Sequence, residues 1–211
     1  MLTGLTLAQL LIVLVAIILA MAIHEAMHGY VAHMLGDTTA KDAGRLTLNP
    51  LKHIDLLTTI LLPIVMILTT GRPIFAAKPV PFNPNRVKFG DYGAALVALA
   101  GPFTNLVLAA LSALALRLFG SGMTMGIANS ILAFLEVNVA FFVFNMIPLP
   151  PLDGSRVLYA FAPEGLRRVM EQIEALGFFT LLIFFVILIQ FQSVGNAITV
   201  LENRVTQFLI G

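Results

Sequence analysis

Hydrophobic residues are gathered into long runs along this 211-residue chain, and short polar stretches separate them. The runs cover residues 5–35, 92–119 and 127–147, and a last strong one covers 176–189. A helix needs about 20 apolar residues to cross the roughly 30 Å hydrocarbon core of a bilayer. The pattern therefore predicts about four transmembrane helices, the last of them a C-terminal span over 166–191.

A further apolar run at 56–70 is shorter than the length needed to cross the hydrocarbon core, and Pro63 interrupts it. The stretches on its two sides, 36–53 and 71–90, are both basic. Because positive residues mark cytoplasmic loops, a crossing here would put one basic loop outside. We expect a re-entrant segment bent at Pro63 with both flanks in the cytoplasm; a thin ordinary span is the alternative.

Weaker patterns predict three further elements. Residues 45–49 alternate like a strand and 75–82 read as extended chain, so we expect short membrane-associated β strands there. In the tail, 193–211, apolar residues recur at spacings of three and four: Val194, Ile198, Leu201, Val205 and Phe208. This spacing predicts an amphipathic helix that lies on the outer membrane surface or packs against a neighbouring span.

Composition supports an integral membrane protein. Hydrophobic residues make up 59% of the chain and charged residues 11%, against about 25% charged in soluble domains; the mean hydropathy is +0.96. We expect an all-α polytopic membrane protein of one domain, 1–211, with a core at about 5–160. The N-terminus lacks the features of a cleaved signal, so its first run is expected to stay. A net charge of +1 carries no nucleic-acid signal, and the absence of cysteine excludes disulfides and thiolate ligands.

The C-terminal third of the first run holds an HExxH motif, His24, Glu25 and His28. Two histidines four apart share one helix face and can hold one zinc ion. The glutamate can take a proton from a zinc-bound water. Such chemistry at membrane depth is costly unless it is used, so the motif indicates a zinc protease acting within or beside the bilayer. Catalytic zinc usually has three protein ligands, so one must come from elsewhere.

The stretch from Asn145 to Gly154 offers a candidate, Asp153. Its prolines cannot continue the preceding helix, so Asp153 should stand on unwound chain near the cytoplasmic end of that span. The histidines are expected towards the same face. A capping role for Asp153 at the start of a helix near Ser155 is the alternative.

Three motifs together resemble the site-2 protease family of intramembrane zinc metalloproteases. The matches are HExxH, a GPxxN motif with Gly101, Pro102 and Asn105, and an NxxPxxPxxDG motif with Asn145, Pro148, Pro151, Asp153 and Gly154. They lie within residues 20–160 in the family's order. The resemblance implies one zinc on His24, His28 and Asp153, with Glu25 as general base and acid. It implies that Asn105 and Asn145 support the ligands or bind the substrate main chain.

The resemblance also implies the setting. Expected substrates are single-span membrane proteins already trimmed by another protease, in a prokaryotic cell membrane, with the active site nearer the cytoplasmic face. No PDZ or nucleotide-sensing domain is present in the sequence, so we expect a minimal form. A zinc transporter or a catalytically silent relative are the competing classes; few metal-binding residues outside the motifs argue against the first, and the intact Glu25 against the second.

Polar residues outside these motifs have less definite roles. Asn138 shares a helix face with Asn145 and is expected to be packing between spans. Glu136 is 17 residues from Asp153, too far to be a ligand. We expect a partner for it on another span, such as Arg117. Of the two histidines outside the motif, we expect His33 to be interfacial and regard His53, near the re-entrant segment, as the one with a candidate role.

Overall fold

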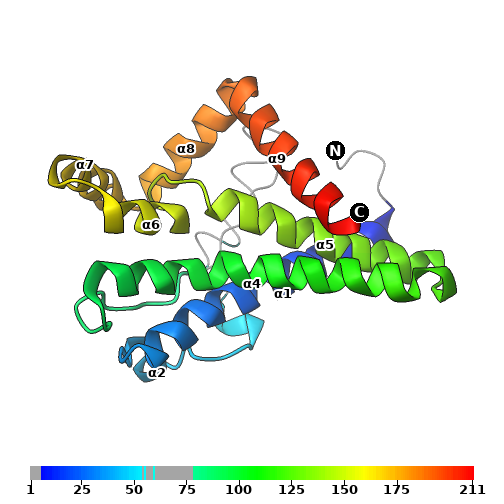
Figure 1. Cartoon of the computed structure of the whole chain (residues 1–211), viewed down its shortest axis with the longest axis horizontal. Coiled ribbons are helices and arrows are strands. Elements are labelled where there is room, and N and C mark those ends of the chain that lie inside the picture. Colours follow the sequence, from blue (N-terminus) through cyan, green and yellow to red (C-terminus); the bar gives the residue numbers. More distant parts are fainter. Residues whose placement is uncertain (1–5, 54, 56–58, 60–77) are drawn as a thin grey trace.

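The computed structural model describes residues 6–53, 55, 59 and 78–211, and all regular structure in these residues is helical (Figure 1). Three helices are long and apolar enough to cross a membrane: α1 (Leu7–Met34), α4 (Gly90–Phe119, extended to Gly122) and α5 (Met125–Asn145). The other elements are α2 (Thr39–Asp42), η1 (Pro50–His53), η3 (Gly120–Gly122), α6 (Asp153–Phe161), α7 (Glu164–Ala175), α8 (Phe178–Gln190) and α9 (Gln192–Ile210).

Local sequence explains where the long helices begin and end. The Thr6 side chain accepts from the Gln9 amide, and Gln9 reaches back to the Thr6 amide, so a capping box starts α1. Thr124 caps α5 by a single bond, accepting from the Ile127 amide. After α5 come the prolines at 148, 150 and 151, which cannot continue a helix. The chain therefore turns at this end of α5 and restarts as α6.

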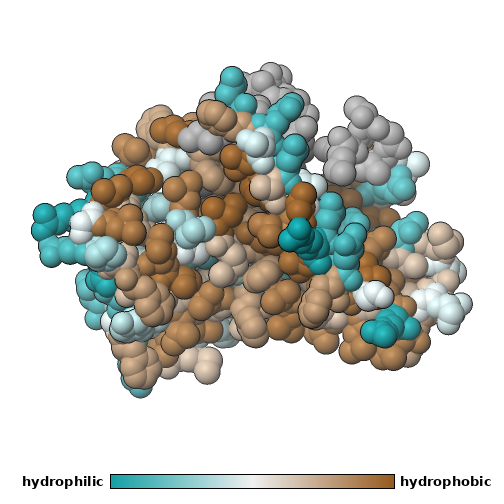
Figure 2. All heavy atoms as spheres, turned by 45° about the horizontal axis from the view of Figure 1, so that its top comes forward, coloured by the Kyte–Doolittle hydropathy of each residue, from teal (hydrophilic) through white to brown (hydrophobic). Residues whose placement is uncertain are grey.

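The long helices α1, α4 and α5 pack against one another and form the centre of the molecule (Figure 1). Their contact faces are built mainly from small side chains, which let helix backbones approach closely in a membrane. Ala20, Ala26, Ala32 and Ala109 are fully buried. Many large apolar side chains are exposed instead, among them Leu14, Phe103 and Leu111, and Figure 2 shows hydrophobic residues over much of the face in view. Small side chains between the helices and large apolar side chains on the outside are typical of a membrane protein, as the composition predicts.

The C-terminal helix α9 packs against α4 and α5, as one of the two sequence-based alternatives predicts. Ile198, Val205 and Leu209 contact the apolar cluster between those helices. The predicted stripe is split, however, because Leu201 and Phe208 are exposed. The packed face of α9 is thus rotated from the stripe that spacing alone suggests.

The expected fourth span is shorter than predicted. The apolar helix α8 has 13 residues, about 20 Å of helix, which is less than the hydrocarbon thickness. It does not continue from α7, because Gly177 between them has a left-handed φ of 55°. A count of four spans is therefore not confirmed. The predicted re-entrant segment at 56–70 lies outside the described residues, apart from Thr59.

Two other expectations differ from the structure. Residues 45–49 form no strand, because their amides bond locally: Thr47 N–H donates to the Arg45 carbonyl and Asn49 N–H to the Thr47 hydroxyl. No strand occurs elsewhere among the described residues either. Glu136 and Arg117 are both exposed and form no ion pair with each other in the described part of the chain.

Candidate active site

The candidate site is centred on three side chains that the structure brings together from two helices. His24 and His28 lie on one face of α1, and Asp153 is the first residue of α6. The two Nε2 atoms are 3.1 Å apart. The Asp153 Oδ2 atom lies 3.1 Å from His24 Nε2 and 3.4 Å from His28 Nε2. These three residues form a group whose ligand atoms could hold one metal ion.

The outward nitrogen of each histidine is tied to an oxygen. His24 Nδ1 lies 2.6 Å from Asn105 Oδ1, and His28 Nδ1 lies 2.7 Å from the Val97 carbonyl on α4. Both oxygens can only accept, so each Nδ1 carries the proton and donates it. Each Nε2 is left with a lone pair directed at Asp153. This is the tautomer that metal-binding histidines need.

The donor set fits a zinc ion. In the neutral form of both imidazoles, two lone pairs and a carboxylate oxygen converge within 3.4 Å of one another. Such a group of acceptors is repulsive until a cation sits among them, and nitrogen and carboxylate oxygen are ligands that zinc accepts. Gly101 adds a second observation. A Cβ there would stand 2.5 Å from His28 Nε2 and 2.6 Å from His24 Nε2, so the absence of a side chain keeps this space open.

The start of α6 determines where Asp153 stands. Gly154 packs so closely against the end of α5 that a Cβ would lie 2.4 Å from the Met146 carbonyl oxygen. Glycine is therefore required for this approach. The capping alternative is not realised, because α6 begins at Asp153 itself and its N-cap residue, Leu152, makes no side-chain cap. The Asp153 carboxylate instead faces the histidines.

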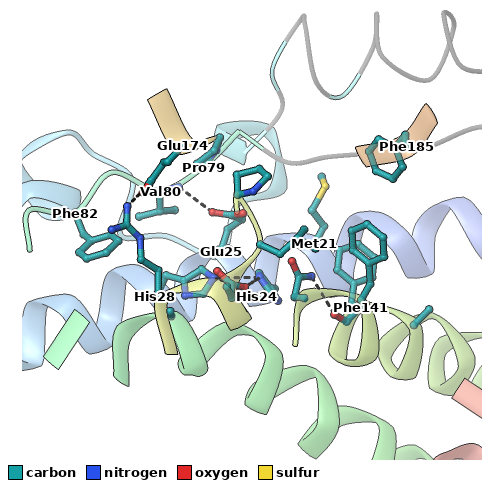
Figure 3. A pocket seen from close by; sticks show the side chains of 18 of the residues that line it. Met21, His24, Glu25, His28, Pro79, Val80, Phe82, Phe141, Glu174 and Phe185 are labelled. Carbon is teal, nitrogen blue, oxygen red and sulfur yellow. Dashed lines mark hydrogen bonds and ion pairs between the residues drawn. The ribbon is translucent and has the colours of Figure 1, made fainter. Parts of the chain in front are cut away.

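Glu25 faces an extended segment, residues 78–83, which we call the strap. Its Oε2 atom accepts a 2.8 Å hydrogen bond from the Val80 amide (Figure 3). The strap is fixed at both ends. At Lys78 the amide donates to the His53 carbonyl and the carbonyl accepts from Arg45. At the other end the Asn83 amide donates to Asp37.

The site opens into a pocket of about 680 Å³. His24, Glu25, His28 and Asp153 line one part of it, with the strap residues Pro79, Val80 and Phe82 beside them (Figure 3). Aromatic side chains line another part: Phe141 and Phe144 of α5 and Phe185 of α8. Arg156 and Glu174, which form an ion pair between α6 and α7, also line the pocket, as does Glu202 of α9.

The two predicted asparagines lie in different places. Asn105 is fully buried behind His24 and does not line the pocket. Asn145 does line it, and its Nδ2 donates to the Phe141 carbonyl of the same helix. Of the two roles left open, the geometry gives Asn105 ligand support and leaves Asn145 facing the pocket.

Comparison with known proteins identifies the family. The protein named "Putative zinc metalloprotease YwhC" of Bacillus subtilis is 40% identical over 179 residues, which cover 82% of this chain and 78% of that protein. The chain belongs to the site-2 protease family. Two proteins named "Putative zinc metalloprotease Rip2" are also similar, at 30% identity in Mycolicibacterium smegmatis and 28% in Mycobacterium tuberculosis. The matches cover 80% of this chain and 64% of each Rip2 protein. No family model and no solved structure matches the chain.

Some groups of this candidate site were not found by sequence reasoning. The Val97 carbonyl and the Val80 amide are main-chain groups, so the residue type at these positions does not indicate their role. The role of Gly101 could have been predicted from the sequence, since a glycine inside an apolar helix usually marks close packing. Asn138 was assigned to packing, although the structure places it next to Asn105. His53 is not part of the group; its Nε2 donates to the Thr47 carbonyl and fixes the loop before the strap.

Proposed function

We propose that this chain is an intramembrane zinc metalloprotease that hydrolyses peptide bonds in or near transmembrane segments. One observation carries the proposal: two histidines and a carboxylate converge beside a glutamate, at a pocket among helices apolar enough to span a membrane. His24, His28 and Asp153 would hold one zinc ion per chain. The names of the bacterial relatives support the zinc metalloprotease activity.

Glu25 has the position and the chemistry of a general base and acid. When bound, zinc would lower the pKa of water and polarise the scissile carbonyl. Glu25 then accepts a proton from the attacking water and returns it to the leaving amine, so no covalent intermediate with the protein is needed. Its Oε2 atom is held by the Val80 amide, which orients the carboxylate and leaves Oε1 for the proton.

The strap and Asn145 suggest how a substrate is held. A helical segment must unwind before its peptide bonds can be reached. Pro79 and Pro81 have no amide proton, and the Val80 amide already serves Glu25. The strap therefore offers carbonyl oxygens, to which an unwound substrate can donate its N–H groups as a strand does. The Asn145 Oδ1 atom, whose Nδ2 is occupied in α5, can accept one more.

The expected substrates are single-span membrane proteins, including ones already shortened by another protease. A pocket with aromatic walls accommodates apolar side chains of such a segment, and its polar end accommodates the unwound backbone. We place the site near the cytoplasmic face of a prokaryotic cell membrane, because the stretches 36–53 and 71–90, the second of which contains the strap, are basic and mark that side.

Glu25→Gln tests the proposal against its alternatives. The purified full chain is incubated with a single-span protein in detergent or vesicles, and both cleavage and bound zinc are measured. Removing the base should reduce cleavage by at least about 10²- to 10⁴-fold while zinc stays bound. Glu174→Gln makes the same change elsewhere in the pocket and should leave most of the cleavage. Unchanged cleavage in Glu25→Gln would overturn the proposed mechanism. A chain that binds zinc but cleaves none of a panel of single-span proteins would favour a silent relative.

A further inference from the structure

A chain of side-chain amides runs from the metal centre through the middle of the helix bundle. Asn105 Oδ1 accepts from His24 Nδ1 at 2.6 Å. Asn105 Nδ2 in turn donates to Asn138 Oδ1 on α5 at 2.8 Å, and weakly to the Ala20 carbonyl at 3.4 Å. Asn138 Nδ2 donates to the Phe134 carbonyl at 2.8 Å. Asn105 and Asn138 are both 0% exposed, so water does not compete for these bonds.

The direction of every bond in this chain is set at its far end. The Phe134 carbonyl can only accept, so the NH₂ group of Asn138 must face it. The Asn138 oxygen then faces Asn105 and requires the NH₂ group of Asn105 on that side. The Asn105 oxygen is thereby directed at His24, where it can only accept. His24 must protonate Nδ1 and keep the Nε2 lone pair for the metal.

We propose that Asn138 is a positioning residue for the metal centre, acting through Asn105 on the tautomer and orientation of His24. This inference rests on the zinc site of the proposed function. It corrects the interpretation of Asn138 as packing between spans. Without the Asn138 oxygen, Asn105 retains only the long bond to Ala20 on this side, and its amide loses the reason to keep its oxygen towards His24.

A pure packing role makes a different prediction, and it is the alternative to exclude. If Asn138 only fills space, any side chain of similar volume will serve. If it acts through its oxygen, the replacement must accept a hydrogen bond. Leucine has about the right volume and no acceptor. Aspartate accepts from Asn105 in either protonation state, and when protonated it also donates to the Phe134 carbonyl as asparagine does.

The test is zinc affinity, measured by competition with a chelating indicator on the full-length protein in detergent. Asn138→Leu should weaken zinc binding about 10-fold, the low end of the roughly 10- to 100-fold loss expected for a group bonded directly to a metal-binding histidine, because Asn138 acts through Asn105. Asn138→Asp should stay within about threefold of wild type. Ser112→Ala is the matched control: it removes a buried polar group of α4 that bonds only within its own helix, and should also stay within threefold.

A second background separates positioning from packing. Asn105→Asp presents an oxygen to His24 whichever way its carboxylate turns, so its orientation no longer depends on Asn138. In that background Asn138→Leu should change zinc affinity by less than about threefold, which is a strong coupling between the two sites. Asn138→Ala answers the same question if Asn138→Leu is not recovered folded, and the same loss and the same suppression are expected.

The outcomes distinguish this inference from the function it rests on. A loss in Asn138→Leu that Asn138→Asp does not share, and that Asn105→Asp suppresses, supports the positioning role. An equal loss in both backgrounds, or no loss at all while wild type binds zinc, overturns it and leaves the protease proposal intact. Failure of wild type to bind zinc overturns both.

Discussion

The two sides of the active site are held in different ways. On the metal side, His24 and His28 are fixed by buried groups of the neighbouring spans, namely Asn105 and the Val97 carbonyl. On the strap side, the extended chain beside Glu25 is fixed by loops, through Asp37 and Arg45. The metal side is thus anchored inside the helix bundle, whereas the substrate side is anchored outside it.

This difference separates two requirements of the proposed reaction. Metal ligands must converge within tenths of an ångström, and packed helices with buried hydrogen bonds provide that rigidity. A substrate has to enter, and none of the described residues donates a hydrogen bond to the strap carbonyls of residues 79–82. Changes on the metal side should therefore alter zinc binding. Changes on the strap side should alter cleavage or stability while zinc binding is retained.

The largest effect is expected from Gly101→Ala. The new methyl group would stand 2.5–2.6 Å from both Nε2 atoms, where the ligand set must stay open. One of the histidines has to move, so zinc binding should fall by at least about 100-fold, and cleavage with it. Elemental analysis of the purified variant measures the loss. Gly126→Ala is the control, because nothing lies within 4 Å of a Cβ at that position. Normal zinc content in Gly101→Ala would show that the ligand geometry is not as described.

An intermediate effect is expected from Asp37→Asn, which weakens the strap. The Asp37 carboxylate is fully buried and accepts from the Asn83 amide at 2.6 Å and from the Thr39 amide and hydroxyl at 3.0 and 2.5 Å. The substitution replaces one accepting oxygen by an NH₂ group, which cannot accept from these donors. The free energy of unfolding should therefore fall by about 1–3 kcal/mol. A displaced strap should slow cleavage roughly 10- to 100-fold. Zinc content should not change, and a zinc loss as large as that of Gly101→Ala would contradict the separation of the two sides.

The same aspartate predicts a dependence on pH. Burial alone would raise the pKa of Asp37, but hydrogen bonds from Thr39 and Asn83 outweigh it and hold the pKa below its ordinary value of 3.8. Because the folded state has the lower pKa, this stabilisation is present above about pH 4 and is lost as the pH falls through the lowered value. Thermal unfolding between pH 3 and 7 should show a steeper acid-side decline in wild type than in Asp37→Asn. Parallel curves would exclude this contribution of Asp37.

The smallest effect is expected from Arg156→Gln at the pocket. Its ion pair with Glu174 has side chains 31% and 42% exposed, and exposed pairs contribute about 0–1 kcal/mol. Stability should change by less than that, with unaltered zinc content. Thermal unfolding and elemental analysis check both. A destabilisation above about 2 kcal/mol would mean that this pair holds α6, and hence Asp153, in place.

Sequence predicted the metal side better than the strap side, for a physical reason. The shared face of His24 and His28 follows from helical periodicity, and the end of α5 follows from the prolines, so both depend on local rules. Asp153 was expected on unwound chain, but it is the first residue of α6. The strap depends on main-chain contacts between distant segments, such as the Val80 amide on Glu25, and residue types do not reveal these. The direction of the Asn105–Asn138 bond is equally non-local. The fourth span was predicted too long because it included residues 166–175, which carry Arg167, Arg168, Glu171 and Glu174 and belong to the separate helix α7.

The most direct test is the zinc content of wild type and Asp153→Ala, purified side by side and measured by elemental analysis. The structure places Asp153 Oδ2 within 3.4 Å of both ligand nitrogens, so we predict near one zinc per chain in wild type and clearly less in the variant. No zinc in wild type after gentle reconstitution, or equal zinc in both proteins, would contradict the metal centre on which the proposed function depends.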